Sequence, residues 1–252
     1  MNSYPLIMRF LGLDESELIN RIHQVLDDSH SHYFIKLVHN ELVLEVMGSV
    51  SSAFHLRRAI IKPLWHFFVG YGTGTVESTV GHKLIQNHLT VTSAESLTCG
   101  LFQSTLGRIP GISSVFSGGF VTYSDYIKHR LLSIPSKVIR ENGVVSKPTA
   151  IWMAKQSQFI MKTDLAISFT GVAGPSPLEG HSSGTVWIGL AYHHHYGAKL
   201  YQLNLLCSEL TQYYRKCAAL TDVRSLQRNM IRRLSVKMGF KMINDKLRAN
   251  GY

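Results

Sequence analysis

The feature that most constrains the fold is an alternation of strand-like and helix-like segments from residue 76 onward. Short apolar runs typical of strands occupy residues 89–93, 119–123 and 164–169, and helical patterns occupy 76–88, 98 onward, 125 onward and 146–162. Residues 184–192 and 199–206 suit a hairpin at the sheet edge, followed by closing helices over 209–238. Such alternation predicts an α/β protein, a layered α/β/α sandwich.

A smaller α+β unit is predicted before this region. Asp14 and Glu17 have capping-box spacing, so a helix is expected to follow the apolar run at 6–13. Strands are expected at 33–39 and 42–47 and a second helix at 52–68, all before the glycine-rich segment GYGTGT. Glycine is unfavourable inside helices and strands. We therefore predict two domains, residues 1–72 and 73–252.

Composition further narrows the class of protein to which this sequence can belong. The chain has 252 residues, 45% of them hydrophobic, without the roughly 20-residue apolar run of a membrane span or the pattern of a signal peptide, so we expect a cytoplasmic protein with no membrane contact. Cys99, Cys207 and Cys217 lack metal-type spacing, and His193–His195 reads as a polar turn. No metal site is predicted.

Positive charge is concentrated near the end of the sequence. The net charge is +10, and residues 215–248 hold ten Lys or Arg against two Asp. A basic surface favours anionic partners, either a nucleotide phosphate or a nucleic acid backbone. Most such charges in proteins are simply solvated on a helix face.

Four polar or glycine-rich segments lie near strand ends, where α/β proteins place their sites. They cover residues 93–100, 110–114, 121–128 and 170–175. Lys128 falls in the first turn of a predicted helix, so it can reach back across the strand ends. A partly desolvated amine there can act as a base for a serine hydroxyl.

These segments contain AESLTCG, PGISS, GGFVTYSDYIK, ENGVVS, FTGVAGP and GTVWIGLA in this order. The ordered set resembles the nicotinamide-nucleotide amidase domain of the CinA (competence/damage-inducible protein) family over residues of roughly 76–240. FLGLDESEL resembles the small KH-type domain that precedes the amidase in that family, so a KH-like front unit is expected.

The resemblance implies a serine/lysine amidohydrolase that converts nicotinamide mononucleotide to nicotinate mononucleotide and ammonia, without a cofactor and as a homodimer. Carried over by motif, the catalytic candidates are Ser113, Lys128, Tyr123 and Ser96. Ser113 is the preferred nucleophile with Lys128 as base, and Ser96 remains the rival. The substrate-binding candidates are Thr98, Gly100, Thr170, Gly171, Gly174, Arg224 and Arg228.

Two departures from the family pattern leave the activity open. Cys99 stands where the family has glycine, and residues 176–183 lack the family's usual Lys-Pro before GTV. The alternative hypothesis is a catalytically inactive nucleic-acid-binding or interaction protein. No GxxG loop of the KH type is present in the front unit, which argues against RNA binding.

Overall fold

The computed structural model describes residues 5–13, 15–25, 32–47, 50–204 and 223–252. The chain forms two compact units, residues 1–79 and 80–252. Three predicted features lie wholly or partly outside the described residues. They are the helix start at Asp14, the end of the strand at 199–206 and the first part, 209–222, of the helix region 209–238. Among the residues that are described, no helix is both long enough and apolar enough to cross a membrane.

The first unit is a four-stranded antiparallel sheet with two helices. Its sheet order is β2-β3-β1-β4, which is the split βαβ order of ferredoxin-like units. The KH-like resemblance of this unit stays a prediction. In chain order the elements are β1 (Leu6–Phe10), α1 (Glu15–Val25), β2 (His32–Val38), β3 (Glu41–Met47), α2 (Val50–Leu64) and β4 (Phe68–Tyr71).

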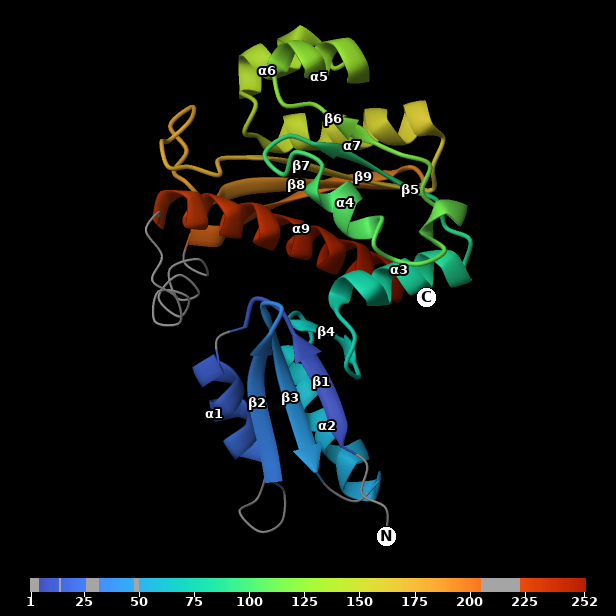
Figure 1. Ribbon diagram of the computed structural model, residues 1–252, viewed down its shortest axis with the longest axis vertical. Coiled ribbons are helices and arrows are strands. Elements are labelled where there is room, and N and C mark those ends of the chain that lie inside the picture. Colours follow the sequence, from blue (N-terminus) through green and yellow to red (C-terminus); the bar gives the residue numbers. More distant parts are fainter. Residues whose placement is uncertain (1–4, 14, 26–31, 48–49, 205–222) are drawn as a thin grey trace. The chain divides into compact units, whose positions relative to one another are not determined.

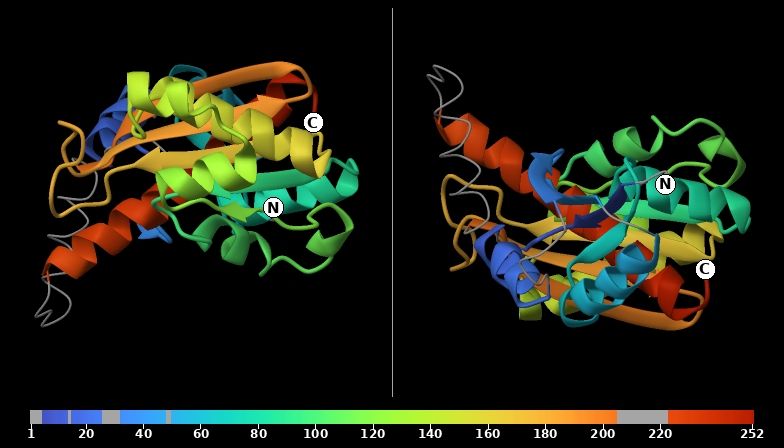
Figure 2. Two further views of the ribbon diagram at one scale, coloured as in Figure 1. Left: turned by 90° about the horizontal axis from the view of Figure 1, so that it is seen from above. Right: turned by 90° about the horizontal axis from the view of Figure 1, so that it is seen from below.

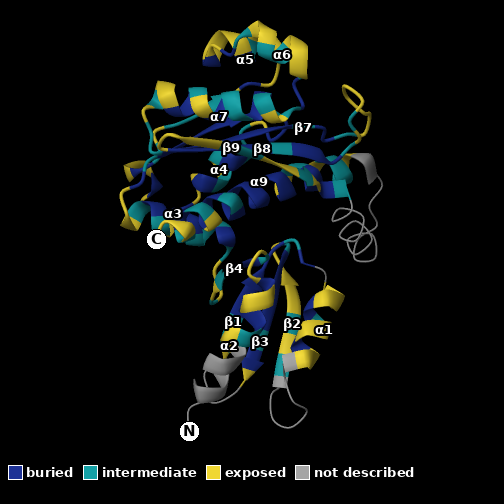
Figure 3. Ribbon diagram, turned by 180° about the vertical axis from the view of Figure 1, so that it is seen from behind, coloured by how far each residue is buried: buried dark blue, intermediate teal, exposed yellow. Residues whose placement is uncertain are grey.

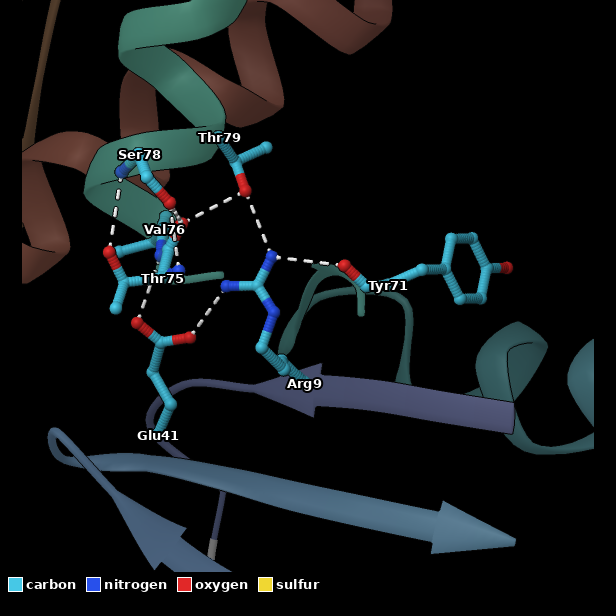
Figure 4. Close-up of polar contacts among 7 residues, drawn as sticks. All are labelled: Arg9, Glu41, Tyr71, Thr75, Val76, Ser78 and Thr79. Atoms are coloured by element: carbon cyan, nitrogen blue, oxygen red, sulfur yellow. Dashed lines mark hydrogen bonds and ion pairs between the residues drawn. The ribbon is translucent and has the colours of Figure 1, made fainter. Parts of the chain in front are cut away.

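A buried ion pair lies at the end of this unit, where α3 (Val76–Gln86) begins. Arg9 Nη1 donates to Glu41 at 2.9 Å, and the other Glu41 oxygen accepts the Val76 N–H at 3.0 Å (Figure 4). Arg9 Nη2 donates to the Thr79 hydroxyl at 2.9 Å. These bonds tie the first turn of α3 to the first sheet, so the division between the units falls inside α3. Whether separate domains divide at residues 72–73 stays a prediction.

One secondary-structure prediction here is wrong. Residues 70–75 were expected to interrupt regular structure, but Gly70 belongs to β4 and pairs with Arg9 of β1. A Cβ atom at position 70 would lie 2.8 Å from Arg9 Nη2. The glycine is therefore compatible with the strand because it leaves room for the buried guanidinium.

The second unit is a three-layer α/β/α sandwich, as predicted (Figure 1). Its sheet order is β6-β5-β7-β8-β9, with β5 parallel to β6 and β7, and with β7, β8 and β9 antiparallel in turn. The elements are β5 (Val91–Glu95), α4 (Leu101–Leu106), the 3-10 turn η1 (Ile112–Ser114), β6 (Phe120–Val121), α5 (Asp125–Leu132), α6 (Ser136–Asn142), α7 (Lys147–Met161), β7 (Leu165–Gly171), β8 (Thr185–Tyr192), β9 (His195–Gln202) and α9 (Val223–Ala249).

Helices cover both faces of this sheet. α7 packs along β5, β7, β8 and β9, and α9 packs on β7 and β8 from the other side (Figure 2). β7 and β8 are accordingly buried along almost their whole length (Figure 3). The rings of Phe102, Phe169 and Phe240 join α4, β7 and α9, with centroid separations of 5.6 and 4.5 Å.

Local sequence signals account for the ends of several helices and strands. The Ser146 side chain accepts the Thr149 N–H at 3.3 Å, and Lys162 ends α7 with a left-handed φ of 53°, which confirms the predicted ends of this helix. The predicted hairpin is also confirmed, because β8 and β9 pair up to a turn at His193 and His194.

Candidate active site

Three parallel strand ends meet at Ser96. The residue follows β5 directly, and its backbone N–H donates to Phe169 O of β7 at 2.9 Å. On the other side the Thr122 N–H, just after β6, donates to Glu95 O at 2.7 Å. The serine is thus held at the carboxyl ends of neighbouring strands, where sites of α/β sheets collect.

Lys128 reaches this point from the first turn of α5. Ser124 caps the helix by accepting the Ile127 N–H, and the cap sets the direction in which the turn projects. The Lys128 side chain is 1% exposed. Its Nζ donates to Ser96 Oγ at 3.2 Å and to Thr122 O at 3.0 Å.

The surroundings of Lys128 shift its pKa downward. Burial lowers the pKa of the Lys128 amine, and the carboxylates of Asp125 and Glu179 only partly oppose this. Within the described part of the chain Lys128 forms no ion pair. A buried lysine whose amine meets a hydroxyl and a carbonyl, and no carboxylate, is suited to accept a proton from that hydroxyl.

The turn that follows Ser96 is fixed by a buried carboxylate that the sequence analysis did not single out. Glu95 is fully buried and accepts the N–H groups of Phe102 and Gln103 at 3.1 and 3.0 Å, which are orphan donors in the first turn of α4. Cys99 and Gly100 precede that helix with left-handed φ values of 49° and 84°. The predicted helix start at Thr98 is therefore three residues too early.

Arg232 of α9 holds the same turn from the other side. Its Nε donates to Leu97 O at 3.1 Å and its Nη2 to Thr98 O at 2.9 Å. The C=O of Leu97 and the N–H of Thr98 belong to one planar peptide and point in opposite directions. Arg232 therefore turns the Thr98 N–H away from itself, and in the described structure no acceptor takes up this N–H.

Two buried hydroxyls lie close in sequence to the Ser96–Lys128 pair. The side chains of Thr98 and Thr122 are fully buried, and neither Oγ1 has a hydrogen-bond partner among the described residues. Buried hydroxyls without partners are uncommon in folded proteins. They are available to a bound molecule or to water.

Arg228, one turn before Arg232, joins two of the predicted motifs. Its Nη1 donates to Gly174 O at 2.6 Å and its Nη2 to the Tyr123 hydroxyl at 2.8 Å. Tyr123 is 53% exposed, so its ring faces solvent beside this contact. The structure therefore brings together Tyr123, Gly174 and Arg228, which lie far apart in the sequence.

The remaining predicted residues of the glycine-rich loop have packing contacts. Thr170 donates its hydroxyl to Val144 O at 2.6 Å. Gly171 allows β8 to approach, because a Cβ there would lie 2.5 Å from Thr185 O. Both contacts fix the backbone that leads to Gly174.

Ser113 and Arg224 are placed differently from Ser96 and Arg228. Ser113 lies exposed in η1, and no hydrogen bond of its side chain is found within the described residues. Arg224 lies in the first turn of α9, but its side chain is outside the described part. The four-residue spacing that was matched to Arg224 and Arg228 fits Arg228 and Arg232 equally, and these two side chains reach the site.

The fold and this site define a class: a three-layer α/β protein with a serine–lysine pair, of which the lysine is buried, at the carboxyl ends of parallel strands. No group of three or more potential metal ligands occurs among the described side chains.

The comparisons with known proteins name the family. The model of the CinA C-terminal domain matches residues 73–226, so this chain belongs to the CinA C-terminal domain family. A putative competence-damage inducible protein of Lactiplantibacillus plantarum is 41% identical over 75% of the chain and 47% of its own length. One of Listeria welshimeri is 37% identical over 97% of the chain and 56% of its own length. The chain spans about half the length of these curated relatives.

Solved structures of this superfamily share the fold. A CinA superfamily protein from Klebsiella pneumoniae covers 69% of the chain with a TM-score of 0.57 and 21% identity, and 96% of its own chain is matched. The competence/damage inducible protein CihA from Agrobacterium tumefaciens covers 68% of the chain and 94% of its own, with a TM-score of 0.54 and 24% identity.

Proposed function

We propose that this chain is an amidohydrolase that converts nicotinamide mononucleotide to nicotinate mononucleotide and ammonia, with Ser96 as nucleophile and Lys128 as base. The observation that carries the proposal is the buried Lys128 amine 3.2 Å from Ser96 Oγ, in surroundings that lower its pKa. The choice of a nicotinamide nucleotide as substrate rests on the family resemblance of the motifs.

The chemistry follows from the positions of these two groups. Neutral Lys128 takes the proton of Ser96 Oγ as the oxygen attacks the carboxamide carbon. The protonated amine then gives its proton to the leaving nitrogen, and ammonia departs from an acyl-serine ester. Water repeats the sequence with Lys128 as base, which breaks the ester, returns a proton to Ser96 and releases the nicotinate carboxylate.

The turn around Ser96 supplies the remaining elements. The Thr98 N–H, directed away from Arg232, is our candidate donor to the oxyanion that forms on the carboxamide oxygen. Gly100 keeps the turn open at the start of α4. Arg228, with Tyr123 beside it, is our candidate for the substrate phosphate, and Arg224 stays a proposal from its motif.

Ser96 replaces Ser113 as our preferred nucleophile because hydrogen-bond reach to the base is the first requirement of a nucleophile. Ser96 meets Lys128 directly, whereas Ser113 lies exposed on η1. Ser113 stays a candidate substrate contact from its motif.

The test is ammonia release from nicotinamide mononucleotide by the purified chain in the presence of EDTA. We expect wild-type turnover, a loss of at least ~10²-fold in Ser96→Ala and a much smaller loss in Ser113→Ala. Free nicotinamide should be a poorer substrate because it lacks the binding energy of the phosphate. An inactive Ser113→Ala variant beside an active Ser96→Ala variant would contradict the assignment of Ser96 as nucleophile. If the wild-type protein released no ammonia at high enzyme concentration, the proposed activity would be wrong.

A further inference from the structure

The loop between β7 and β8 departs from the family pattern, and its tip is a tight turn. Leu178 and His181 bond to each other through both backbone groups, at 3.1 and 2.9 Å. The two residues between them, Glu179 and Gly180, have left-handed φ values of 50° and 77°. Leu178 is exposed, and a Cβ at Gly180 would meet nothing within 4 Å. Apolar packing therefore does not hold this tip in place.

A carboxylate holds it instead. The two oxygens of Glu179 accept the adjacent N–H groups of Val144 and Val145, at 3.0 and 3.1 Å. Gly143 makes this approach possible, because a Cβ there would lie 2.5 Å from Glu179 Oε2. Hydrogen bonds to an ionised acceptor are stronger than neutral ones, so these two contacts can hold the tip where apolar packing does not.

The same loop is tied to the site at its other end. Gly174, where the loop begins, accepts a hydrogen bond from Arg228, and Arg228 also bonds the Tyr123 hydroxyl. The turn at residues 143–145, to which Glu179 is hydrogen-bonded, also leads directly into α7, which covers the sheet. The loop thus connects two fixed points, one beside Arg228 and one at residues 143–145.

We propose that Glu179 is a positioning residue of the Ser96–Lys128 site: its carboxylate fastens the β7–β8 loop to the turn before α7 and so holds the Gly174 carbonyl where Arg228 meets it. For its kinetic consequences the proposal rests on the proposed function, because Arg228 is there the candidate phosphate ligand.

The charge of Glu179 also acts on the base. Two carboxylates raise the pKa of Lys128 against the effect of burial, Asp125 on the same helix and Glu179 on the loop. The nearby carboxylate of Glu95 is occupied by N–H groups of α4. A neutral residue at 179 should therefore let burial lower the pKa of Lys128 further.

The test compares Glu179→Gln with Glu141→Gln, a matched exposed glutamate on α6 whose only described ion pair is a 3.8 Å contact with Lys137. The first readout is hydrogen exchange of the Val144 and Val145 amides, measured by NMR. A glutamine places an NH₂ group against one of the two N–H donors, so we expect at least ~10-fold faster exchange of one or both amides in Glu179→Gln. Equal exchange rates in both variants and wild type would overturn the proposal.

The second readout is the kinetics with nicotinamide mononucleotide. We expect Glu179→Gln to raise KM several-fold with a smaller change in kcat, and to move the acid limb of the kcat/KM profile to lower pH, because the base then deprotonates more readily. Glu179→Asp keeps the charge but shortens the reach, so it should share the raised KM and keep the wild-type limb. If the acid limb moved to higher pH in Glu179→Gln, the loop would act only by excluding water from Lys128. That result would overturn the role of the Glu179 charge.

The two readouts separate the two proposals. If wild type releases no ammonia while the exchange of Val144 and Val145 still depends on Glu179, the proposed function fails and the fastening of the loop stands. If wild type is active and neither exchange nor KM depends on Glu179, the fastening fails and the proposed function stands.

Discussion

Among the described residues, the most deeply buried cation is Arg9 in the first unit and Lys128 in the second, and these two cations differ in their hydrogen-bond partners. Arg9, 2% exposed in the first unit, is paired with the buried carboxylate of Glu41 and with two further acceptors (Figure 4). Among the described residues, Lys128 in the second unit has only a hydroxyl and a carbonyl within hydrogen-bond reach. Burial lowers the pKa of Lys128.

The difference shows how burial alone fails to identify a functional cation. A guanidinium stays protonated at any physiological pH and its planar fork satisfies several acceptors at once, so it serves well as a fixed structural joint. A lysine amine can lose its proton when desolvated. The cation without a carboxylate is therefore the candidate for chemistry. Three experiments can break or sharpen this contrast, and a fourth tests the turn beside Ser96.

The largest expected effect is on turnover. Lys128→Met removes the base, so we expect ammonia release to fall by ~10²–10⁴-fold. Lys137→Met, which changes an exposed lysine on α6, is the control and should keep wild-type turnover. Comparable activity of the two variants would show that the buried amine takes no part in the reaction.

The second effect is on the stability of the first unit. Arg9→Met removes the guanidinium while the Glu41 carboxylate stays buried, which should lower the free energy of unfolding by about 3–5 kcal/mol. Urea denaturation followed by circular dichroism measures this loss. Replacing both residues, Arg9→Met with Glu41→Leu, should recover much of it, because no charge is then left in the core; a double variant as unstable as the single one would count against the explanation.

A smaller effect of opposite sign is expected for the stability of Lys128→Met. The folded state lowers the pKa of Lys128 below its ordinary value of 10.5. At a pH between the pKa of the folded state and that of the unfolded state, the folded chain therefore binds fewer protons than the unfolded chain. Wild-type stability rises with pH across that window. The methionine variant should therefore be more stable than wild type at pH 7, on the order of 1 kcal/mol, with the advantage shrinking toward pH 10.5. A variant less stable than wild type at pH 7 would mean that the amine stabilises the fold.

The smallest effect concerns Cys99, whose left-handed φ of 49° is unfavourable for any residue with a Cβ. Cys99→Gly relieves about 1–2 kcal/mol of strain and costs about 0.5–1 kcal/mol in chain entropy, so the midpoints of these ranges give an expected gain of about 0.75 kcal/mol. Thermal unfolding measures it. Cys99→Ala keeps the strain, and a gain of the same size in that variant would show that the sulfur, and not the backbone, is the cause.

Much of the fold could be predicted because its signals are local. The Ser146 cap and the hairpin at the sheet edge depend on neighbouring residues, and both were predicted. β4 was missed because the reason for Gly70 is Arg9, about sixty residues earlier in the sequence. The short α6 was also missed, since seven residues carry too little periodicity to recognise.

The predictions for the site divide in the same way, into those that rest on local sequence and those that depend on distant contacts. The reach of Lys128 toward the strand ends follows from its place in the first turn of α5, and the motifs named Ser96, Tyr123, Gly174 and Arg228. Sequence could not choose between Ser96 and Ser113, because the choice depends on which hydroxyl the folded chain brings to the amine. Arg232 and Glu179 were not assigned, since their partners are 134 and 35 positions away.

The basic residues near the end of the sequence illustrate the same limit. Composition alone allowed a nucleic acid surface, but three described basic side chains of α9 are used within the unit. Arg228 and Arg232 bond the site, and Lys241 pairs with Asp245 at 2.6 Å.

The parallel pairing of β5 with β7 has a consequence for how the chain is synthesised. Thr90 and Asp164, which close one end of this pair, are 74 positions apart, and the backbone of Ser96 is anchored to Phe169. On the ribosome Ser96 emerges well before the strand that anchors it, and pairing across so long a loop is slow. Until β7 has left the exit tunnel and docked, Ser96 therefore lacks its backbone anchor, and the candidate site is not yet assembled.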